Sequence, residues 1–554
     1  MRRRKTVIIG GVAGGASTAA RLRRLDKDRE IIMIERGDYI SFANCGLPYH
    51  IGEVIEDRED LLIMTPELMK ERFEIDVRIR HEVIRINKEE KKIIVKNIDD
   101  DLEYEETYDD LVIASGSSPL RPRIEGIESN RILTLSNIFD MDRIKDAISK
   151  SDIKDVAVIG GGFIGLEMAD NLHEANKNVT IIEALNQVMA PLDYEMAQII
   201  HENILDNGVT LHLNDGVASF EENDKVKIIL NSGKELEVDL VILAIGVRAN
   251  SELAKDAGLE INERGGIVVD EHMQTSDPNI YAVGDVVEVV DYIFKDKTMI
   301  PLAGPANKQG RILADNLAGI NSTYKGTQGS SIAKIFDLTA ASTGVNEKGL
   351  IRHNLVKDKD YYSIIIRQNS HASYYPGAQE MAIKLLFSTD GKKIYGAQIV
   401  GREGVDKRID VLATAIRLNA SIDDLKELEL AYAPPYSSAK DPVNMAGFVA
   451  DNVINGLVKI AAYDEYDNNS DKVLLDVRED YEYEYNHVEG SIHIPLGELR
   501  ESIKNLDKEK SYIILCAVGV RAYNAARIMS QNGFEDVSVY PAGVSFYQTT
   551  HKKV

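Results

Sequence analysis

The chain has 554 residues, of which 44% are hydrophobic and 28% are charged, and its formal net charge is −25. This length allows three or four domains of ordinary size. The acidic balance argues against nucleic acid or an anionic membrane surface as the main partner, so an anionic ligand would need a local basic pocket. No stretch approaches the roughly 18–20 apolar residues that span a bilayer. The short N-terminal apolar run is broken by glycines and does not fit a signal peptide. We therefore expect a cytoplasmic protein.

The first predicted element is an apolar strand over residues 4–9, which leads into the loop Gly10–Gly15 and a helix to about Leu25. A second strand ends on Glu35. This order is typical of dinucleotide binding, because glycines let the backbone approach the pyrophosphate and the helix N-terminus supplies N–H groups. The carboxylate after the second strand accepts hydrogen bonds from a ribose. Val12 stands where the pattern has its second glycine.

The same arrangement recurs at Val156–Ile159, where a strand leads into the loop Gly160–Gly165, a helix and a strand that ends on Glu183. The glycine pattern is complete in this loop, and two such units predict two nucleotide sites. Three further apolar strands end in small or acidic residues that fit the same fold, namely Ser115-Gly116, Gly246 and Gly284-Asp285.

Together these motifs resemble the flavoprotein disulfide reductases that bind two dinucleotides, over residues 1 to about 450. The resemblance implies FAD in the first site and NAD(P)H in the second, and an interface domain that forms a homodimer. The predicted fold is α/β, with two Rossmann-like domains and an α+β dimerisation domain. The expected boundaries are 1–112 with 251–322 for FAD, 113–250 for NAD(P)H, and 323–455 for the interface domain. In the last of these, strands are expected at Ile332–Phe336, Ala382–Phe387 and Ile394–Val400, and a helix near Lys407–Leu418.

The predicted cofactor-binding residues follow from these motifs and from the resemblance. Phe163 and Ile164 are expected at the gate over the flavin, and Glu167 beside the nicotinamide. Glu183 would repel the extra phosphate of NADPH, so NADH is the expected donor and NADPH the alternative. The full set is Gly10, Val12, Ala13, Gly15, Glu35, Arg36, Ser115, Gly116, Gly160, Gly162, Phe163, Ile164, Gly165, Glu167, Glu183, Gly246, Gly284, Asp285 and Ala303.

The chain contains two cysteines, Cys45 and Cys516, and no CxxC pair. Cys45 lies in Ser41–Tyr49, just before a predicted short helix whose dipole would lower the pKa of a thiol from about 8.5 to about 4–7. Because no second cysteine is close in sequence, its redox cycle would use an exogenous sulfur, as a mixed disulfide, or oxygen, as a sulfenic acid.

The Cys45 motif resembles the single-cysteine branch of the family, which comprises coenzyme A disulfide reductases, NADH oxidases and NADH peroxidases. The oxidases and peroxidases usually have a histidine where Ala13 stands, which favours the coenzyme A members. Arg21, Arg23 and Arg24 would suit the phosphates of coenzyme A, although a solvated helix face is the alternative. The predicted coenzyme A residues are Ser17, Arg21, Arg24, Ser41 and Asn44.

The resemblance also implies active-site tyrosines that the partner subunit donates. We map these to Tyr374 and Tyr432, with Tyr375 and Tyr436 as rivals in the same two segments. A tyrosine hydroxyl can protonate a leaving thiolate, which would replace the histidine of dithiol reductases.

The C-terminal part, 472–554, is predicted to be a separate α/β domain after an acidic linker at 456–471. A buried strand runs into Cys516, and Cys-x4-Arg ends on Arg521, which gives a six-residue loop that suits a persulfide. This loop, together with Leu474–Glu479 and His487–Pro495, resembles a rhodanese domain. Cys516 and Arg521 are predicted to be catalytic, and Asp476 and Arg478 to stabilise the fold near the loop.

The whole sequence thus resembles a fusion of coenzyme A disulfide reductase with rhodanese. We expect an FAD-dependent NAD(P)H oxidoreductase that reduces a disulfide, persulfide or polysulfide linked to coenzyme A, with no metal. The sequence does not distinguish among these substrates, or coenzyme A as substrate from coenzyme A as a permanent group. Two alternatives remain open here: an NADH oxidase that reduces oxygen, and a redox or persulfide sensor with incidental turnover.

Overall fold

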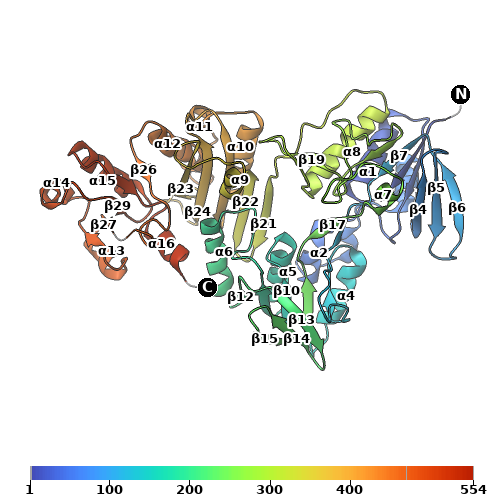
Figure 1. The fold of residues 1–554 in the computed structure, drawn as a ribbon, viewed down its shortest axis with the longest axis horizontal. Coiled ribbons are helices and arrows are strands. Elements are labelled where there is room, and N and C mark those ends of the chain that lie inside the picture. The colour runs from blue at the N-terminus through green and yellow to red at the C-terminus, as the bar shows by residue number, and fades with distance from the viewer. Residues whose placement is uncertain (1–2, 470, 553–554) are drawn as a thin grey trace. The chain divides into compact units, whose positions relative to one another are not determined.

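The computed structural model describes residues 3–469 and 471–552, which fold into two compact units (Figure 1). The first unit comprises the chain up to Ala184 together with Asp215–Gly329. The second comprises Leu185–Asn214 and the chain from Ser330 onward. Across the described residues, no helix combines the length and the apolar character that a membrane crossing requires.

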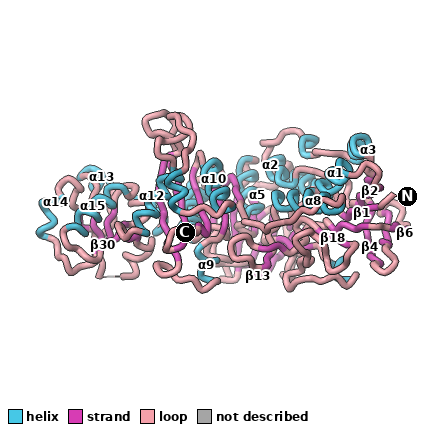
Figure 2. Tube along the Cα trace, turned by 90° about the horizontal axis from the view of Figure 1, so that it is seen from above, coloured by secondary structure: helices cyan, strands magenta, loops and turns pink. Residues whose placement is uncertain are grey.

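The first predicted nucleotide unit is confirmed as a five-stranded sheet in the order β18-β7-β1-β2-β3. All of its neighbouring strands are parallel, and the apolar side chains of the three central strands are buried on both faces. Helices α1 (Ala13–Leu25) and α8 (Ala303–Leu317) lie side by side (Figure 2). The strands are β1 (Lys5–Ile9), β2 (Glu30–Ile34), β3 (Asp76–Arg78), β7 (Asp110–Ile113) and β18 (Ile280–Ala282).

The second predicted nucleotide unit is confirmed as a sheet in which β11, β10, β16 and β9 are parallel neighbours. An antiparallel sheet, β13-β14-β15, packs its apolar residues into the same core as Ala157 and Ile159. The elements are β9 (Ile132–Leu133), β10 (Asp155–Ile159), α5 (Phe163–Glu174), β11 (Asn178–Ile182), β13 (Val217–Glu222), β14 (Val226–Leu230), β15 (Glu235–Val238) and β16 (Leu240–Leu243).

Smaller elements complete the first unit. They are the 3-10 turns η1 (Asn44–Gly46) and η2 (Arg58–Leu61), the helices α2 (Leu47–Ile51), α3 (Pro66–Phe73), α4 (Ile138–Ile148) and α7 (Glu252–Asp256), and the strands β4 (His81–Asn87), β5 (Lys92–Asn97), β6 (Glu103–Thr107), β8 (Ser117–Pro119), β17 (Val247–Ala249), β19 (Val289–Val290) and β20 (Lys297–Thr298).

The second unit contains a five-stranded antiparallel sheet in the order β21-β22-β25-β24-β23. The three expected strands and the expected helix are confirmed, whereas β22 and β23 were not predicted. The elements are α6 (Tyr194–Asp206), β12 (Thr210–His212), β21 (Ser331–Ile335), β22 (Leu338–Gly344), α9 (Glu347–Arg352), β23 (Tyr361–Asn369), β24 (Glu380–Ser388), β25 (Ile394–Gly401), α10 (Val405–Arg417), α11 (Ile422–Glu427) and α12 (Pro442–Ile454).

A buried ion cluster connects the start of α6 with β24 of this sheet. The Nζ atom of Lys384, on β24, lies 2.8 Å from Asp193, 2.5 Å from Glu195 and 2.6 Å from Glu347. Burial disfavours the charged amine, but the three carboxylates raise the pKa of Lys384 well above its usual value. These carboxylates are also the one group among the described residues with metal-ligand spacing. The lysine ammonium supplies the positive charge at their centre.

The C-terminal domain is confirmed as an α/β fold with a parallel sheet in the order β26-β30-β29-β27-β28. Its elements are β26 (Lys459–Ile460), β27 (Val473–Asp476), α13 (Asp480–Tyr485), β28 (Ile492–His493), α14 (Leu499–Ser502), η3 (Ile503–Asn505), β29 (Tyr512–Leu515), α15 (Val520–Gln531), β30 (Val537–Val539) and α16 (Val544–His551).

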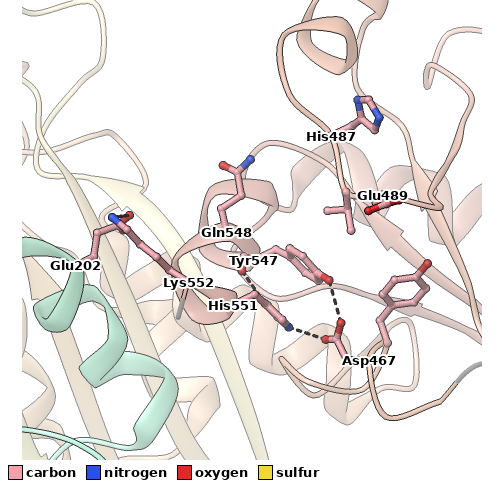
Figure 3. Close-up of a pocket in the computed structure, with 10 residues that line it drawn as sticks. Glu202, Asp467, His487, Glu489, Tyr547, Gln548, His551 and Lys552 are labelled. Carbon is pink, nitrogen blue, oxygen red and sulfur yellow. Dashed lines mark hydrogen bonds and ion pairs between the residues drawn. The ribbon is translucent and has the colours of Figure 1, made fainter. Parts of the chain in front are cut away.

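The predicted linker 456–471 differs from expectation, because β26 is an edge strand of this sheet. Beyond it, Asp467 accepts hydrogen bonds from the Tyr547 hydroxyl at 3.0 Å and from His551 Nε2 at 2.5 Å (Figure 3). These residues line a cavity of about 570 Å³. The polar residues that suggested a linker therefore make side-chain contacts with α16, as Asp467 does. Gly456 and Ser470 also fall in the predicted linker, and Ser470 lies outside the described residues.

Candidate functional site

The two glycine loops have the same close-packed geometry. A Cβ atom added to Gly15 would lie 1.9 Å from the carbonyl oxygen of Gly10, and one added to Gly165 would lie 1.9 Å from that of Gly160. Neither position tolerates a side chain, so each helix starts directly against its strand. At Gly162 a Cβ would meet nothing within 4 Å, which leaves room for a phosphate beside the α5 N-terminus. In the first loop, Val12 is the N-cap of α1, and neither helix has a side-chain cap.

Glu35 and Glu183 both turn back onto these loops. Glu35 accepts hydrogen bonds from the N–H groups of Gly11 at 2.9 Å and Gly37 at 2.8 Å. Glu183 accepts one from the N–H of Gly161 at 2.7 Å. Each carboxylate therefore lies at the mouth of a glycine loop, where a ribose would meet it. The residues present fit a dinucleotide at both loops.

The Gly284-Asp285 turn is held by two residues that lie outside the sequence motifs, Ser117 and Gln309. The N–H of Gly284 donates to Gln309 Oε1 at 2.8 Å, and Ser117 Oγ donates to Asp285 at 3.2 Å. Burial raises the pKa of Asp285, and the bond from Ser117 only partly offsets this. Ser115 Oγ donates to the carbonyl of Asn250 at 2.7 Å, which connects two crossover segments.

The predicted cofactor residues Gly116 and Gly246 both have positive φ, at 65° and 113°. Ala303 is the first residue of α8 and is exposed, as is Arg36. Phe163 and Ile164 start α5, with Ile164 exposed, in keeping with a gate over a ligand.

Cys45 lies in the 3-10 turn η1, directly before α2, and is exposed. The prediction that its pKa is lowered was wrong in this structure: burial raises it, and the carboxylates of Glu167 and Asp285 raise it further. α2 has only five residues, so its dipole is small. Burial, together with the nearby carboxylates, outweighs it.

Glu167, on the first turns of α5, accepts a long hydrogen bond of 3.4 Å from the hydroxyl of Tyr49. Burial raises the pKa of Glu167 to about 7, and burial with the Glu167 charge raises that of Tyr49 to about 12. Tyr49 was not among the predicted site residues, although it closes the Cys45 motif. The structure thus brings Cys45, Tyr49, Glu167 and Asp285 into one electrostatic cluster.

Glu167→Gln is expected to lower the pH at which Cys45 becomes reactive. Above pH 7 the wild-type carboxylate is charged and opposes the thiolate, whereas glutamine stays neutral. The measurement is the rate of iodoacetamide alkylation of the NADH-reduced protein as a function of pH. Glu174→Gln, at the exposed end of the same helix, is the matched control. An unchanged profile in Glu167→Gln would show that the two groups are not coupled.

Several of the predicted coenzyme A residues already have protein partners. Arg21 binds Asp315 of α8 at 2.9 Å, Ser17 Oγ donates to Asn307 at 2.5 Å, and Arg24 stacks on Phe73. In the same helix, Arg23 donates to four backbone carbonyls, including that of Phe73 at 2.7 Å, so it fastens the helix end and is not a free cation.

Ser41 and Asn44 both precede Cys45, and Asn44 is the first residue of its turn. Ser41 has a positive φ of 46°, and its N–H donates to the carbonyl of Gly11 at 2.8 Å. Asn44 is exposed at the start of η1. The Cys45 segment is thereby fastened to the first glycine loop.

The structure brings Tyr374 and Tyr432 together, with their hydroxyl oxygens 2.9 Å apart. Both rings are exposed, at 74% and 48%, and the shared hydrogen bond raises the pKa of Tyr432. The rivals differ, since Tyr375 packs edge-on against His371 and Tyr436 has no part in the pair. The pair belongs to the second compact unit and Cys45 to the first.

Cys516 follows β29 and is buried. Its Sγ accepts a hydrogen bond of 3.1 Å from the N–H of Gly519, the N-cap of α15, which has a positive φ of 114°. Arg521 donates to both carboxylate oxygens of Glu482, at 2.5 and 2.7 Å, and this pairing raises the pKa of Arg521. The loop therefore holds its sulfur against a backbone N–H at a helix start.

Asp476 and Arg478 form a buried pair at 2.7 Å, and Arg478 also donates to Asn486. These contacts fit the structural role that we expected for them. A cavity of about 340 Å³ opens beside the Cys516 loop and includes Ala517, Val518 and Glu482 in its lining.

Three regions of the chain match known families. Residues 4–310 match the pyridine nucleotide-disulphide oxidoreductase family, and residues 330–442 match its dimerisation domain. Residues 461–550 match the rhodanese-like domain. The family implies FAD and NAD(P)H as cofactors.

The chain is 38% identical to a coenzyme A disulfide reductase of Staphylococcus epidermidis over 447 residues, which is 80% of this chain and 99% of that protein. The crystal structure of reduced Bacillus anthracis CoADR-RHD is 50% identical and has a TM-score of 0.96, covering 99% of this chain and 98% of that one. An NAD-dependent persulfide reductase from A. fulgidus is 38% identical, with a TM-score of 0.93 and coverage of 98% and 99%. The chain therefore belongs to the pyridine nucleotide-disulphide oxidoreductase family, among the coenzyme A disulfide reductase homologues that carry a C-terminal rhodanese-like domain.

Proposed function

We propose that the protein uses NADH to reduce a disulfide, persulfide or polysulfide linked to coenzyme A at Cys45, and that it transfers sulfane sulfur at Cys516. The observation that carries this proposal is the placement of the two cysteines of the chain. Cys45 is exposed beside the first glycine loop, and Cys516 lies at the start of α15 in a rhodanese-like domain. Each therefore acts with a sulfur from outside the chain.

The predicted loop residues would hold the cofactors, with FAD at Gly10–Gly15 and Gly284-Asp285 and the nicotinamide dinucleotide at Gly160–Gly165. When bound, FAD supplies the electron relay between the nicotinamide and the Cys45 disulfide. Glu183 lies at the mouth of the second loop through its bond to Gly161, where it would meet the ribose and repel an added phosphate. NADH is accordingly the proposed donor.

At Cys45, the thiolate attacks the sulfur–sulfur bond of the substrate, and a coenzyme A thiolate leaves as Cys45–S–S–CoA forms. Two electrons and a proton then return Cys45 to the thiolate and release the second coenzyme A. With a persulfide substrate the first leaving group is hydrosulfide instead. Glu167, with a pKa of about 7, is suited to give or accept a proton near neutral pH.

Tyr374→Phe and Tyr432→Phe are each expected to lower the rate on coenzyme A disulfide by about a hundredfold. The proposed role of the hydroxyl pair is to protonate the leaving thiolate at the active site of the partner subunit. Tyr375→Phe and Tyr436→Phe are the controls, because neither joins the pair. The measurement is anaerobic NADH oxidation. If the controls lost as much activity, the effect would come from any change in these two segments and not from the pair of hydroxyl groups.

The test of the proposed function is anaerobic NADH oxidation with coenzyme A disulfide and coenzyme A persulfide supplied side by side. Faster turnover on the persulfide would make the protein a sulfane-sulfur reductase, with Cys516 acting in the same sequence of reactions. Faster turnover on the disulfide would make it a reductase of the thiol pool. If neither substrate accepted electrons, the coenzyme A assignment would be wrong.

The dimerisation domain supports a homodimer, and we propose a cytoplasmic site of action, where a thiol would stay reduced. An oxygen-reducing NADH oxidase is not favoured, because Ala13 stands where such oxidases usually have a histidine and a rhodanese-like domain would have no use. A pure sensor is likewise not favoured, because the comparisons are to named reductases.

A further inference from the structure

The cavity beside the Cys516 loop is lined partly by residues from outside the rhodanese-like domain. Its lining combines Ala517 and Val518 of the loop with Arg367 and Glu380. These last two residues come from β23 and β24 of the dimerisation domain. A rhodanese-like pocket is therefore completed by the preceding domain of the same chain.

Arg367 sits on β23, the edge strand of the five-stranded sheet. Its guanidinium lies 2.6 Å from a carboxylate oxygen of Glu380, whose side chain is 49% exposed. Such a half-exposed ion pair is weak and exchanges readily, so an anion in the cavity can replace the carboxylate. Guanidinium groups bind oxyanions with two parallel hydrogen bonds, which suits this exchange.

The other arginine that lines the cavity, Arg478, already has partners, because it is bound to the buried Asp476 and to Asn486. Arg521, which ends the Cys516 loop, is held by both oxygens of the lining residue Glu482. Among the described residues that line the cavity, Arg367 is thus the cation with the most exposed partner.

We propose that Arg367 is the anion-binding residue of the Cys516 sulfurtransferase site, and that its ligand is an anionic sulfane-sulfur donor. This inference rests on the proposed sulfurtransferase function of Cys516. The anion is either the sulfonate of thiosulfate or the phosphates of coenzyme A persulfide, which share the same oxyanion chemistry.

The reaction at this site balances without an added oxidant or reductant. The Cys516 thiolate attacks the outer sulfur of the donor, the sulfur–sulfur bond breaks, and its electron pair leaves on sulfite or on the coenzyme A thiolate. Cyanide then removes the transferred sulfur as thiocyanate and restores the Cys516 thiolate. Arg367 positions the donor for the first step and takes no part in bond exchange.

The test measures thiocyanate formation by the full-length holoenzyme with three donors: thiosulfate, coenzyme A persulfide and pantetheine persulfide. Pantetheine persulfide has the same thiol arm as coenzyme A persulfide but lacks its adenosine phosphates. Arg367→Ala is expected to raise the KM for thiosulfate about tenfold, as the loss of one charged hydrogen-bond partner would do, with little change in kcat. Arg367→Lys should recover part of the affinity. Glu380→Gln should lower the KM, because it removes the competing carboxylate.

Arg352→Ala, on the exposed end of α9 in the same domain, is the matched control and should leave the KM unchanged. A higher KM for coenzyme A persulfide, but not for pantetheine persulfide, would identify the phosphates as the anion that Arg367 binds. A higher KM for thiosulfate alone would identify the sulfonate. Unchanged KM values for all three donors in Arg367→Ala, or equal losses with all three, would overturn the inference. Cys516→Ser tests the proposed sulfurtransferase function by itself. If this variant still formed thiocyanate, the assignment of that function to Cys516 would be wrong, whatever the result for Arg367→Ala.

Discussion

Replacing Cys45 by serine is expected to lower NADH-driven reduction of coenzyme A disulfide by at least about a thousandfold. A serine hydroxyl cannot form the mixed disulfide through which the substrate is reduced, and the sequence offers no second cysteine nearby. Reduction of the bound flavin by NADH should persist, because the second glycine loop is unchanged. Anaerobic stopped-flow absorbance separates the two steps, since flavin bleaching and substrate turnover are read in the same experiment.

Cys516→Ser is the matched control for this variant, since it removes the other thiol of the chain. It should keep the wild-type rate on coenzyme A disulfide, because that reaction needs only Cys45. Retention of more than about a tenth of the activity in Cys45→Ser would place the chemistry elsewhere.

Lys384→Met is expected to lower the free energy of unfolding by about 3–5 kcal/mol. The change removes the central cation from Asp193, Glu195 and Glu347, which lie close together, and leaves Lys357, at 3.7 Å from Glu347, as a weaker partner at the edge. In the wild type, burial opposes ionisation of Glu347, but the Lys384 charge prevails and lowers its pKa to about 2. Urea denaturation followed by circular dichroism measures the loss.

Lys392→Met, at the exposed turn between β24 and β25, controls for the loss of a lysine from the same sheet. Adding Glu195→Gln and Glu347→Gln to Lys384→Met should recover part of the stability, since it removes the unpaired charges. If Lys384→Met unfolded at the same urea concentration as wild type, the cluster would not be a stabilising feature.

The features that could be predicted from the sequence depend on residues at short, fixed spacing along the chain. Gly165 and Gly160 could be recognised because a close approach between strand and helix excludes every side chain at fixed spacing. Tyr374 and Tyr432 were identified through a resemblance to a family, and their 2.9 Å contact is consistent with that choice over their rivals.

What the sequence did not reveal depends on residues that are distant along the chain. The pKa of Cys45 was predicted in the wrong direction, because burial raises it and the charges of Glu167 and Asp285, which are distant in sequence, raise it further. The same holds for the partners of Arg21 and Lys384, which come from other elements. An acidic, polar stretch without periodicity suggested a free linker, yet side-chain bonds such as that of Asp467 to Tyr547 bind it to the C-terminal domain.

The position of the edge strand β26 leaves only a short connection before the rhodanese-like domain. Helix α12 ends at Ile454 and β26 begins at Lys459, so only residues 455–458 connect the dimerisation domain to the C-terminal sheet. At the far end of that domain, Thr549 of α16 donates to Glu202 of α6 at 2.6 Å. A short connection at one end and a side-chain contact at the other both oppose a large swing of this domain. If the two cysteines exchange sulfur as proposed, we therefore expect a small thiol to carry it, and the rate of exchange to rise with the concentration of that thiol.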